Sequence, residues 1–375
     1  MPRRSRPRRR TWTLVKLAVV MVAVLGLIAL AIPARFIGVH CFSVRSQSIS
    51  RSPELVRATS DVQGYTRSES STFLTLPEWY IVYSAEEYAS FVRSRAPSAF
   101  PYFAAIGQYW RYYEAMCRVT RRVYPFDAGV HLMLGVIGLS FSIEYGVKGA
   151  YENTVGVVTE GIGFYHTEED VFARKTAREY AAFMHTTPWY EFPFASKLEA
   201  LWKETPFWGL DAVRKWERRL VLSVEYAMKA VYAGIIRWST GAVYRPEDLV
   251  IHAWIDDAPE RIFADGRIKK IKAVAPRSYI VTLPRYEAFT QVVVALAKQG
   301  VRFRDVAGND EILLTAIAPG AWDDRLGTAE LLFSESLLTN PAARRIAVRA
   351  PVASLHLILA DLPSRGVTIE HLYDY

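Results

Sequence analysis

The feature that most constrains this chain is an apolar segment near its start. Eighteen uncharged residues run from Leu17 to Ala34, and the wider stretch from Leu14 to Ala34 carries one charge, on Lys16. A helix of this length reaches across the ~30 Å hydrocarbon core of a bilayer. We therefore expect a transmembrane helix over residues 14–34, preceded by a basic tail over residues 1–13.

The charges before this segment indicate its orientation. Six arginines stand in the first ten residues: Arg3, Arg4, Arg6, Arg8, Arg9 and Arg10. Basic residues favour the cytoplasmic side of a membrane span. The prediction is a single-pass protein of a bacterial inner membrane with most of its chain in the periplasm. A cleaved signal peptide is the alternative, because Ala29-Leu30-Ala31 has the form of a cleavage site.

The composition of the remaining chain excludes several classes of partner and site. Without the six tail arginines, 40 basic residues stand against 38 acidic ones, which argues against a nucleic-acid partner. The only cysteines, Cys41 and Cys117, exclude a disulfide-rich scaffold and a cluster of cysteine ligands. We expect these two residues to be free thiols, and we expect no cofactor.

Changes in periodicity divide the chain into further parts. Residues 35–75 are rich in Ser and Arg and indicate a juxtamembrane linker. Residues 76–244 have helical periodicity interrupted by prolines, and residues 245–277 are expected to be a connector. The predicted helices cover Glu86 to Arg95, Tyr102 to Val123, Ala128 to Val155, Glu168 to Met184, Ala195 to Glu204 and Leu210 to Trp238.

The last part, residues 278–375, alternates strand and helix patterns. Val281-Thr-Leu-Pro284, a helix and Gly300-Val301 are matched by Val348-Arg-Ala-Pro351, a helix and Gly366-Val367. Proline at a helix start and glycine past its end are common boundary residues. The pattern predicts a ferredoxin-like α+β sandwich built from two βαβ halves, with Leu331 to Ser334 as an additional strand.

The helical part contains an internal repeat. Ser142-Ile-Glu144-Tyr145-Gly-Val-Lys148-Gly-Ala-Tyr151 recurs as Ser223-Val-Glu225-Tyr226-Ala-Met-Lys229-Ala-Val-Tyr232. Further upstream, Tyr83 to Glu87 matches Tyr165 to Glu169 at almost the same offset. These matches predict a duplicated unit of about eighty residues, with repeats near 76–157 and 158–239.

The repeated motifs supply the candidate site residues. Glu144, Lys148 and Tyr151 share one helix face, and so do their counterparts Glu225, Lys229 and Tyr232. Both helices are otherwise apolar, so these charges must be paired if they are buried. The pairing is either local or crossed between the repeats, with Glu144 meeting Lys229 and Lys148 meeting Glu225. A structural ion-pair network is favoured over a catalytic acid–base site.

Two other features leave alternatives open. Residues 128–147 could form a second membrane span, although the uncharged stretch ends at Ile143 and its length favours a buried core helix. His166, Glu169 and Asp170 have a ligand-like spacing and are weak candidates for a metal site. Thr167 as the cap of a helix, whose first turn favours acidic residues, explains the two acids more simply.

The sequence therefore favours a non-catalytic binding or scaffolding module of the bacterial envelope. Its expected partners are the membrane lipid bilayer and either an apolar, lipid-like ligand or an envelope protein, with homo-oligomers as a further option. A membrane-associated enzyme with its site between the two helical repeats is the first alternative. A two-span protein of transport or signalling is the second.

Overall fold

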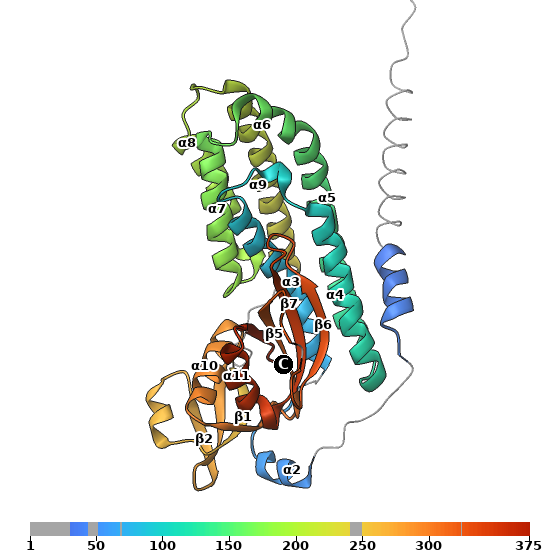
Figure 1. Cartoon of the computed structure of the whole chain (residues 1–375), viewed down its shortest axis with the longest axis vertical. Coiled ribbons are helices and arrows are strands. Elements are labelled where there is room, and N and C mark those ends of the chain that lie inside the picture. Colours follow the sequence, from blue (N-terminus) through green and yellow to red (C-terminus); the bar gives the residue numbers. More distant parts are fainter. Residues whose placement is uncertain (1–30, 44–51, 68–69, 241–249, 324) are drawn as a thin grey trace, which may run out of the picture.

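The computed structural model describes residues 31–43, 52–67, 70–240, 250–323 and 325–375, so the predicted membrane segment lies outside the described residues except for its last four. The described chain forms a long helical bundle with a smaller α/β part against one end (Figure 1). The expected linker over residues 35–75 includes a short helix, α2 (Pro53–Thr59), and the first residues of α3.

Two sets of three helices make up the bundle. The first set comprises α3 (Ser70–Phe91), α4 (Tyr102–Val123) and α5 (Ala128–Tyr151). Helix α5 continues through a π-helical turn, η2 (Glu152–Gly156), into α6 (Val157–Gly163). The second set comprises α7 (Glu168–Met184), α8 (Phe194–Glu204) and α9 (Ala212–Thr240).

Matching contacts show that the two sets are structural repeats. The Trp110 indole donates a 3.0 Å hydrogen bond to Ser142 Oγ, and the Trp202 indole donates a 2.8 Å bond to Ser223 Oγ. Helix α8 has 11 residues and α4 has 22. The difference in residue number between matching positions of the two repeats is therefore larger before these helices end than after them.

The upstream part of the sequence alignment was wrong. Lys148 Nζ lies 4.4 Å from the ring centroid of Tyr88, and Lys229 Nζ lies 5.1 Å from that of Tyr180. The counterpart of Glu87-Tyr88-Ala89 is therefore Glu179-Tyr180-Ala181, and Tyr83 to Glu87 does not correspond to Tyr165 to Glu169. The shortening of α8 hid the true match, because it makes the offset between repeats differ before and after that helix.

The C-terminal part differs from a ferredoxin-like sandwich, because its strands form two sheets. The first sheet contains β1 (Val250–Asp256), β2 (Lys269–Ala275), β3 (Ser278–Pro284) and β4 (Arg302–Val306), with α10 (Glu287–Lys298) before β4. The second contains β5 (Glu311–Pro319), β6 (Glu330–Ser336), β7 (Ala343–Pro351) and β8 (Thr368–Leu372), with α11 (Leu355–Ser364) before β8. All neighbouring strands are antiparallel.

The two sheets have the same order, β2-β3-β1-β4 and β6-β7-β5-β8, so this part is also a duplication, of a βββαβ unit. Its first two strands come from residues 245–277, which were expected to be a connector. The predicted additional strand lies within β6. Strand β2 is an exposed sheet edge containing Lys269, Lys270 and Lys272. Lysines are common on exposed edge strands, where their charge prevents pairing with another chain. They also obscure the apolar alternation by which strands are recognised in a sequence.

Polar contacts join the α/β part to helix α3. The Arg345 guanidinium lies between Glu87 of α3, at 3.0 Å, and Glu370 of β8, at 2.8 Å. The hydroxyls of Tyr83 and Tyr373 are 2.7 Å apart. All of these groups are largely buried, so the second sheet is held against the bundle by contacts that water does not weaken.

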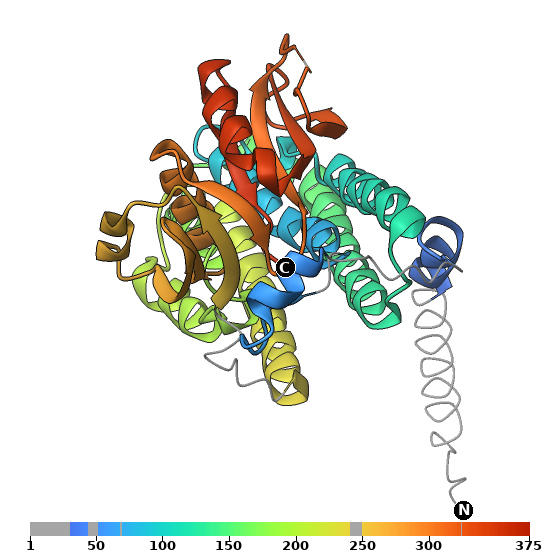
Figure 2. The same cartoon turned by 90° about the horizontal axis from the view of Figure 1, so that it is seen from below.

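A disulfide joins Cys41 to Cys117, so the expectation of two free thiols was wrong. The helix over residues 31–40 lies on the side of α4 and α5 that faces away from the sheets (Figure 2). There Phe36 packs edge-on against Trp110 with the ring centroids 4.9 Å apart. The cysteines are 76 residues apart in sequence, and no local pattern predicts a bridge over such a distance. The bridge fastens the end of the predicted membrane segment to α4.

Candidate functional site

The structure brings four of the six predicted site residues together. Lys148 Nζ lies 3.3 Å from Glu225, and Lys229 Nζ lies 2.8 Å from Glu144 and 3.3 Å from Glu225. The crossed pairing between repeats is therefore present, together with one local pair. Lys148, Lys229 and Glu225 are 15–22% exposed, so the ion pairs are partly sealed from water.

The two tyrosines do not join this group. The Tyr151 hydroxyl donates to Glu217 of α9, whereas the Tyr232 hydroxyl lies 3.0 Å from Ser140 Oγ of α5. The carboxylate, amine and phenol that an acid–base site would combine thus point to different partners.

Glu225 gives this ion-pair group a pH dependence. Burial alone would raise the pKa of its carboxyl, but Lys148 and Lys229 lower that pKa to about 2, below the ordinary value of 4.5. A depressed carboxyl pKa stabilises the fold above the ordinary value, and this stabilisation is lost as the pH falls from about 4.5 towards 2. Glu225→Gln is expected to lower the free energy of unfolding by about 1–3 kcal/mol at pH 7 and by much less near pH 2.

Thermal unfolding of the full chain in mild detergent at several pH values measures this difference. Glu144→Gln is the matched control, because Glu144 is 44% exposed and contacts one lysine. Its effect should be smaller. A Glu225→Gln effect that did not change with pH would contradict the ion-pair account.

A second and more deeply buried charge cluster was not predicted from the sequence. Four cationic residues on two consecutive turns of α9 are 0–3% exposed: Arg214, Lys215, Arg218 and Arg219. They face Glu152 of the π-helical turn and Glu169 and Asp170 of the first turn of α7, which are equally buried. We call these seven residues the charge cluster.

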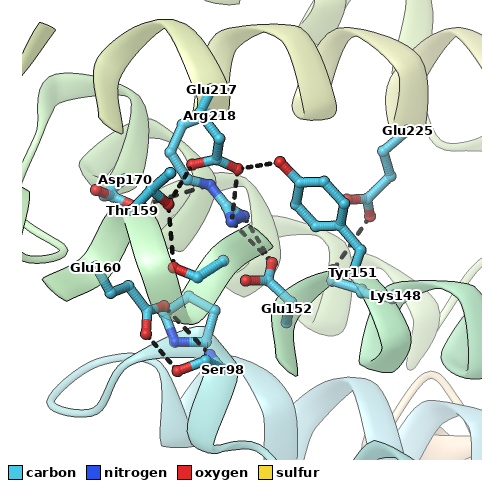
Figure 3. A network of polar contacts seen from close by, with 12 residues as sticks. Ser98, Lys148, Tyr151, Glu152, Thr159, Glu160, Asp170, Glu217, Arg218 and Glu225 are labelled. Atoms are coloured by element: carbon cyan, nitrogen blue, oxygen red, sulfur yellow. Dashed lines mark hydrogen bonds and ion pairs between the residues drawn. The ribbon is translucent and has the colours of Figure 1, made fainter. Parts of the chain in front are cut away.

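Each cation of the charge cluster has a carboxylate partner, and Figure 3 shows Arg218 with Glu152. Arg214 lies 2.9 Å from Asp170, and both terminal nitrogens of Arg218 lie within 2.8 Å of Glu152 Oε1. Glu169 accepts from Arg219 at 2.6 Å and from Lys215 at 3.1 Å. Buried charges are tolerated when they are paired and hydrogen-bonded in this way.

The same contacts bear on the weak metal candidates. Thr167 and Asp170 form a capping box that starts α7, as the sequence suggested. Glu169 and Asp170 point to the cations of α9, whereas the His166 ring packs beside Tyr165 with the centroids 4.4 Å apart. The three candidates therefore do not converge on a common point where an ion could sit.

One sequence signal could have identified the charge cluster. Arg214, Lys215, Arg218 and Arg219 occupy one face of a helix, and the residues of the opposite face are apolar. In a protein surrounded by water the apolar face would be buried. Here the polarity is inverted, because the charged face is buried while Val213 and Leu220 are each 56% exposed.

The exposed apolar residues form stripes on two neighbouring helices. Their side chains are 44–67% exposed, and we call them the apolar face: Leu132, Val136, Ile143, Val147 and Val158 of α5–α6, and Leu220, Val224, Met228, Val231 and Ile235 of α9. Within the described residues, Ala128–Gly163 is a helix long and apolar enough to cross a membrane, and only a third of its most apolar window is buried. This helix is therefore not the fully buried core helix that its length favoured.

Comparisons with known proteins do not assign this arrangement to a family. No protein-family model, curated protein or solved structure matches the chain.

Proposed function

We propose that this chain is a membrane-anchored, non-catalytic binding module whose apolar face lies in the interfacial region of the bilayer. The observation that carries the proposal is the inverted polarity of α9, with charges inside and apolar side chains outside. Ionisable residues of membrane-embedded helices face the bundle interior and pair with one another. An apolar face of this extent on a soluble surface would favour aggregation.

The polar outer surfaces of the other helices support an in-plane contact over a second membrane span. Exposed charged residues occur on α4, α7 and α8: Arg111, Arg118, Arg122, Lys175, Arg178, Glu199, Lys203 and Glu204. A bundle crossing the bilayer would bring these charges into lipid, at a cost of about 2.5–3.5 kcal/mol each. A bundle lying on the membrane immerses one side only, as an amphipathic interfacial helix does.

The anchor and the disulfide support a place outside the cytoplasm. The arginine tail favours a cytoplasmic N-terminus, and the Cys41–Cys117 bridge suits an oxidising compartment such as the periplasm. The helix over residues 31–40 connects this anchor directly to α4 and α5. The bulk of the chain would then rest on the periplasmic surface of an inner membrane.

The enzyme alternative receives less support from the site. A catalytic role for Glu144, Lys148, Glu225 and Lys229 would need an opening lined by these groups. The hollow between α8 and α9 is lined by none of them, and each of the four is engaged in an ion pair.

A depth measurement on the full chain in proteoliposomes tests the proposed contact. An environment-sensitive fluorophore is attached to Val231→Cys on the apolar face and, as the control, to Lys175→Cys on the polar surface of α7. We expect the label at position 231 to be quenched by lipids brominated on their acyl chains and shielded from an aqueous quencher. The label at position 175 should behave in the opposite way.

Equal access of the aqueous quencher to both labels would overturn the membrane contact. The anchor keeps the protein in the vesicles in either case, so the readout reports the position of the bundle and not simple association. The native cysteines form the disulfide and leave the introduced thiol as the reactive one.

A further inference from the structure

An open hollow of about 640 Å³ lies between α8 and α9. Most of its lining is apolar, from Ala195, Leu198, Trp202, Val224 and Ala227. The Trp202 indole nitrogen already donates to Ser223, so its ring offers an apolar surface with no unmet hydrogen bond. Charged side chains occur where α8 meets solvent, as the pair Lys203 and Glu199, which are 72% and 63% exposed.

The internal repeat shows that one lining residue of the hollow has a larger counterpart in the first repeat. The residue that corresponds to Ala195 in the first repeat is Phe103, two residues after the proline that precedes each helix. The Phe103 ring packs beside Gly149, 3.3 Å from the position that a Cβ there would occupy. In the second repeat Ala195, which lines the hollow, has only a methyl group where the first repeat has this ring.

The hollow is continuous with the apolar face, because Val224 belongs to both. A ligand entering from the proposed membrane contact would therefore reach it without crossing water. Its apolar lining provides no hydrogen-bonding group for the body of a polar ligand, whereas an apolar chain would gain by leaving water. Lys203 at the rim pairs with Glu199, and its amine would contact a phosphate in place of that carboxylate.

We propose that the α8–α9 hollow binds one acyl chain of a membrane phospholipid. The proposal rests on the membrane contact of the apolar face and names the ligand class of the binding module. The phosphate of the bound lipid lies near Lys203, and its acyl chain lies along Trp202 and Val224.

A photoreactive phospholipid tests this site. The full chain is reconstituted in vesicles that contain a phosphatidylglycerol with a diazirine on one acyl chain, and the adducts are mapped by mass spectrometry after illumination. We expect adducts on α8, at Leu198 or Trp202, in addition to adducts along the apolar face. Ala195→Phe, which restores the residue of the first repeat, should abolish the α8 adducts.

Two further variants keep the result interpretable. Ala227→Leu fills the same hollow from α9 and should also remove the α8 adducts, whether or not Ala195→Phe folds. Phe103→Ala should open the corresponding space in the first repeat and produce new adducts on α4. The fluorophore at position 231 should report unchanged lipid contact in all three variants, which separates loss of the hollow from loss of the membrane contact.

Three outcomes would overturn the acyl-chain site. The first is an α8 adduct that persists in both filled variants. The second is labelling of the apolar face with no adduct on α8 in the wild type. The third is an equal α8 adduct yield from a photoreactive free fatty acid added without vesicles, because the ligand would then come from solution. Failure of the position-231 label to contact lipid would instead refute the membrane contact itself.

Discussion

Replacing Arg218 by methionine is expected to lower the free energy of unfolding by about 3–5 kcal/mol. Both terminal nitrogens of the Arg218 guanidinium donate hydrogen bonds to Glu152 Oε1, at distances of 2.8 Å or less. The other oxygen of Glu152 has no hydrogen-bond partner in the described part of the chain. Removing Arg218 would leave this buried carboxylate without the two guanidinium donors of its Oε1 atom, and an uncompensated buried charge is far more costly than a lost surface ion pair.

A double variant separates the loss of pairing from the loss of volume. Arg218→Met together with Glu152→Met removes both charges and should recover most of the lost stability, because a buried ion pair can often be replaced by apolar groups of similar size. Arg302→Met is the surface control, since Arg302 and Asp257 are 56% and 49% exposed. Its effect should stay below about 1 kcal/mol.

Thermal unfolding of the full chain in mild detergent, followed by near-ultraviolet circular dichroism, compares these variants. A melting temperature of Arg218→Met equal to that of Arg302→Met would show that the charge cluster does not stabilise the fold. A double variant as unstable as the single one would show that packing around the guanidinium, and not its charge, is what Arg218 supplies.

Removing the disulfide is the second change with a large expected effect. The double variant Cys41→Ala/Cys117→Ala should lower the free energy of unfolding by up to about 4.5 kcal/mol, because the bridge closes a loop of 76 residues that the unfolded chain would otherwise leave open. Both cysteines are buried, and Cys41 adjoins the helix whose Phe36 packs on Trp110. We expect that helix to loosen first.

Hydrogen exchange of the peptide covering residues 31–43 measures the loosening, and thermal unfolding measures the stability. Both are compared between the oxidised wild type, the reduced wild type and the double variant. The reduced wild type should resemble the variant. If exchange in this peptide and the melting temperature were the same in all three proteins, the bridge would have no role in holding the helix to α4.

Local sequence patterns were sufficient to predict most helices and to recognise the repeated motif around Glu144 and Glu225. The spacing placed Glu144 with Lys148 and Glu225 with Lys229, because positions four apart on a helix share a face, and the structure brings these four residues together. The crossed pairing could be stated only as one of two options. The choice between them depends on how two helices pack, and that information is not present in either helix alone.

The features that the sequence did not reveal depend on contacts between distant residues. The division of the strands into two sheets follows from the pairing of β1 with β3 and β4, and β1 lies in a segment that resembled a connector. The charge cluster was missed because a run such as Arg218-Arg219 normally indicates a solvent-exposed face. Its burial becomes evident only when the apolar residues on the other side of α9 are also considered.

The disulfide also bears on how strongly the bundle would need to bind in the proposed membrane contact. Because Cys41 follows the predicted anchor by seven residues and is bonded to α4, an anchor over residues 14–34 would hold the bundle beside the lipid by a short connection. A short tether corresponds to an effective concentration in the millimolar range. On the proposed membrane contact, an affinity of the apolar face that is negligible for a free protein would then keep the bundle on the lipid, and the contact would release and re-form without the protein leaving the membrane.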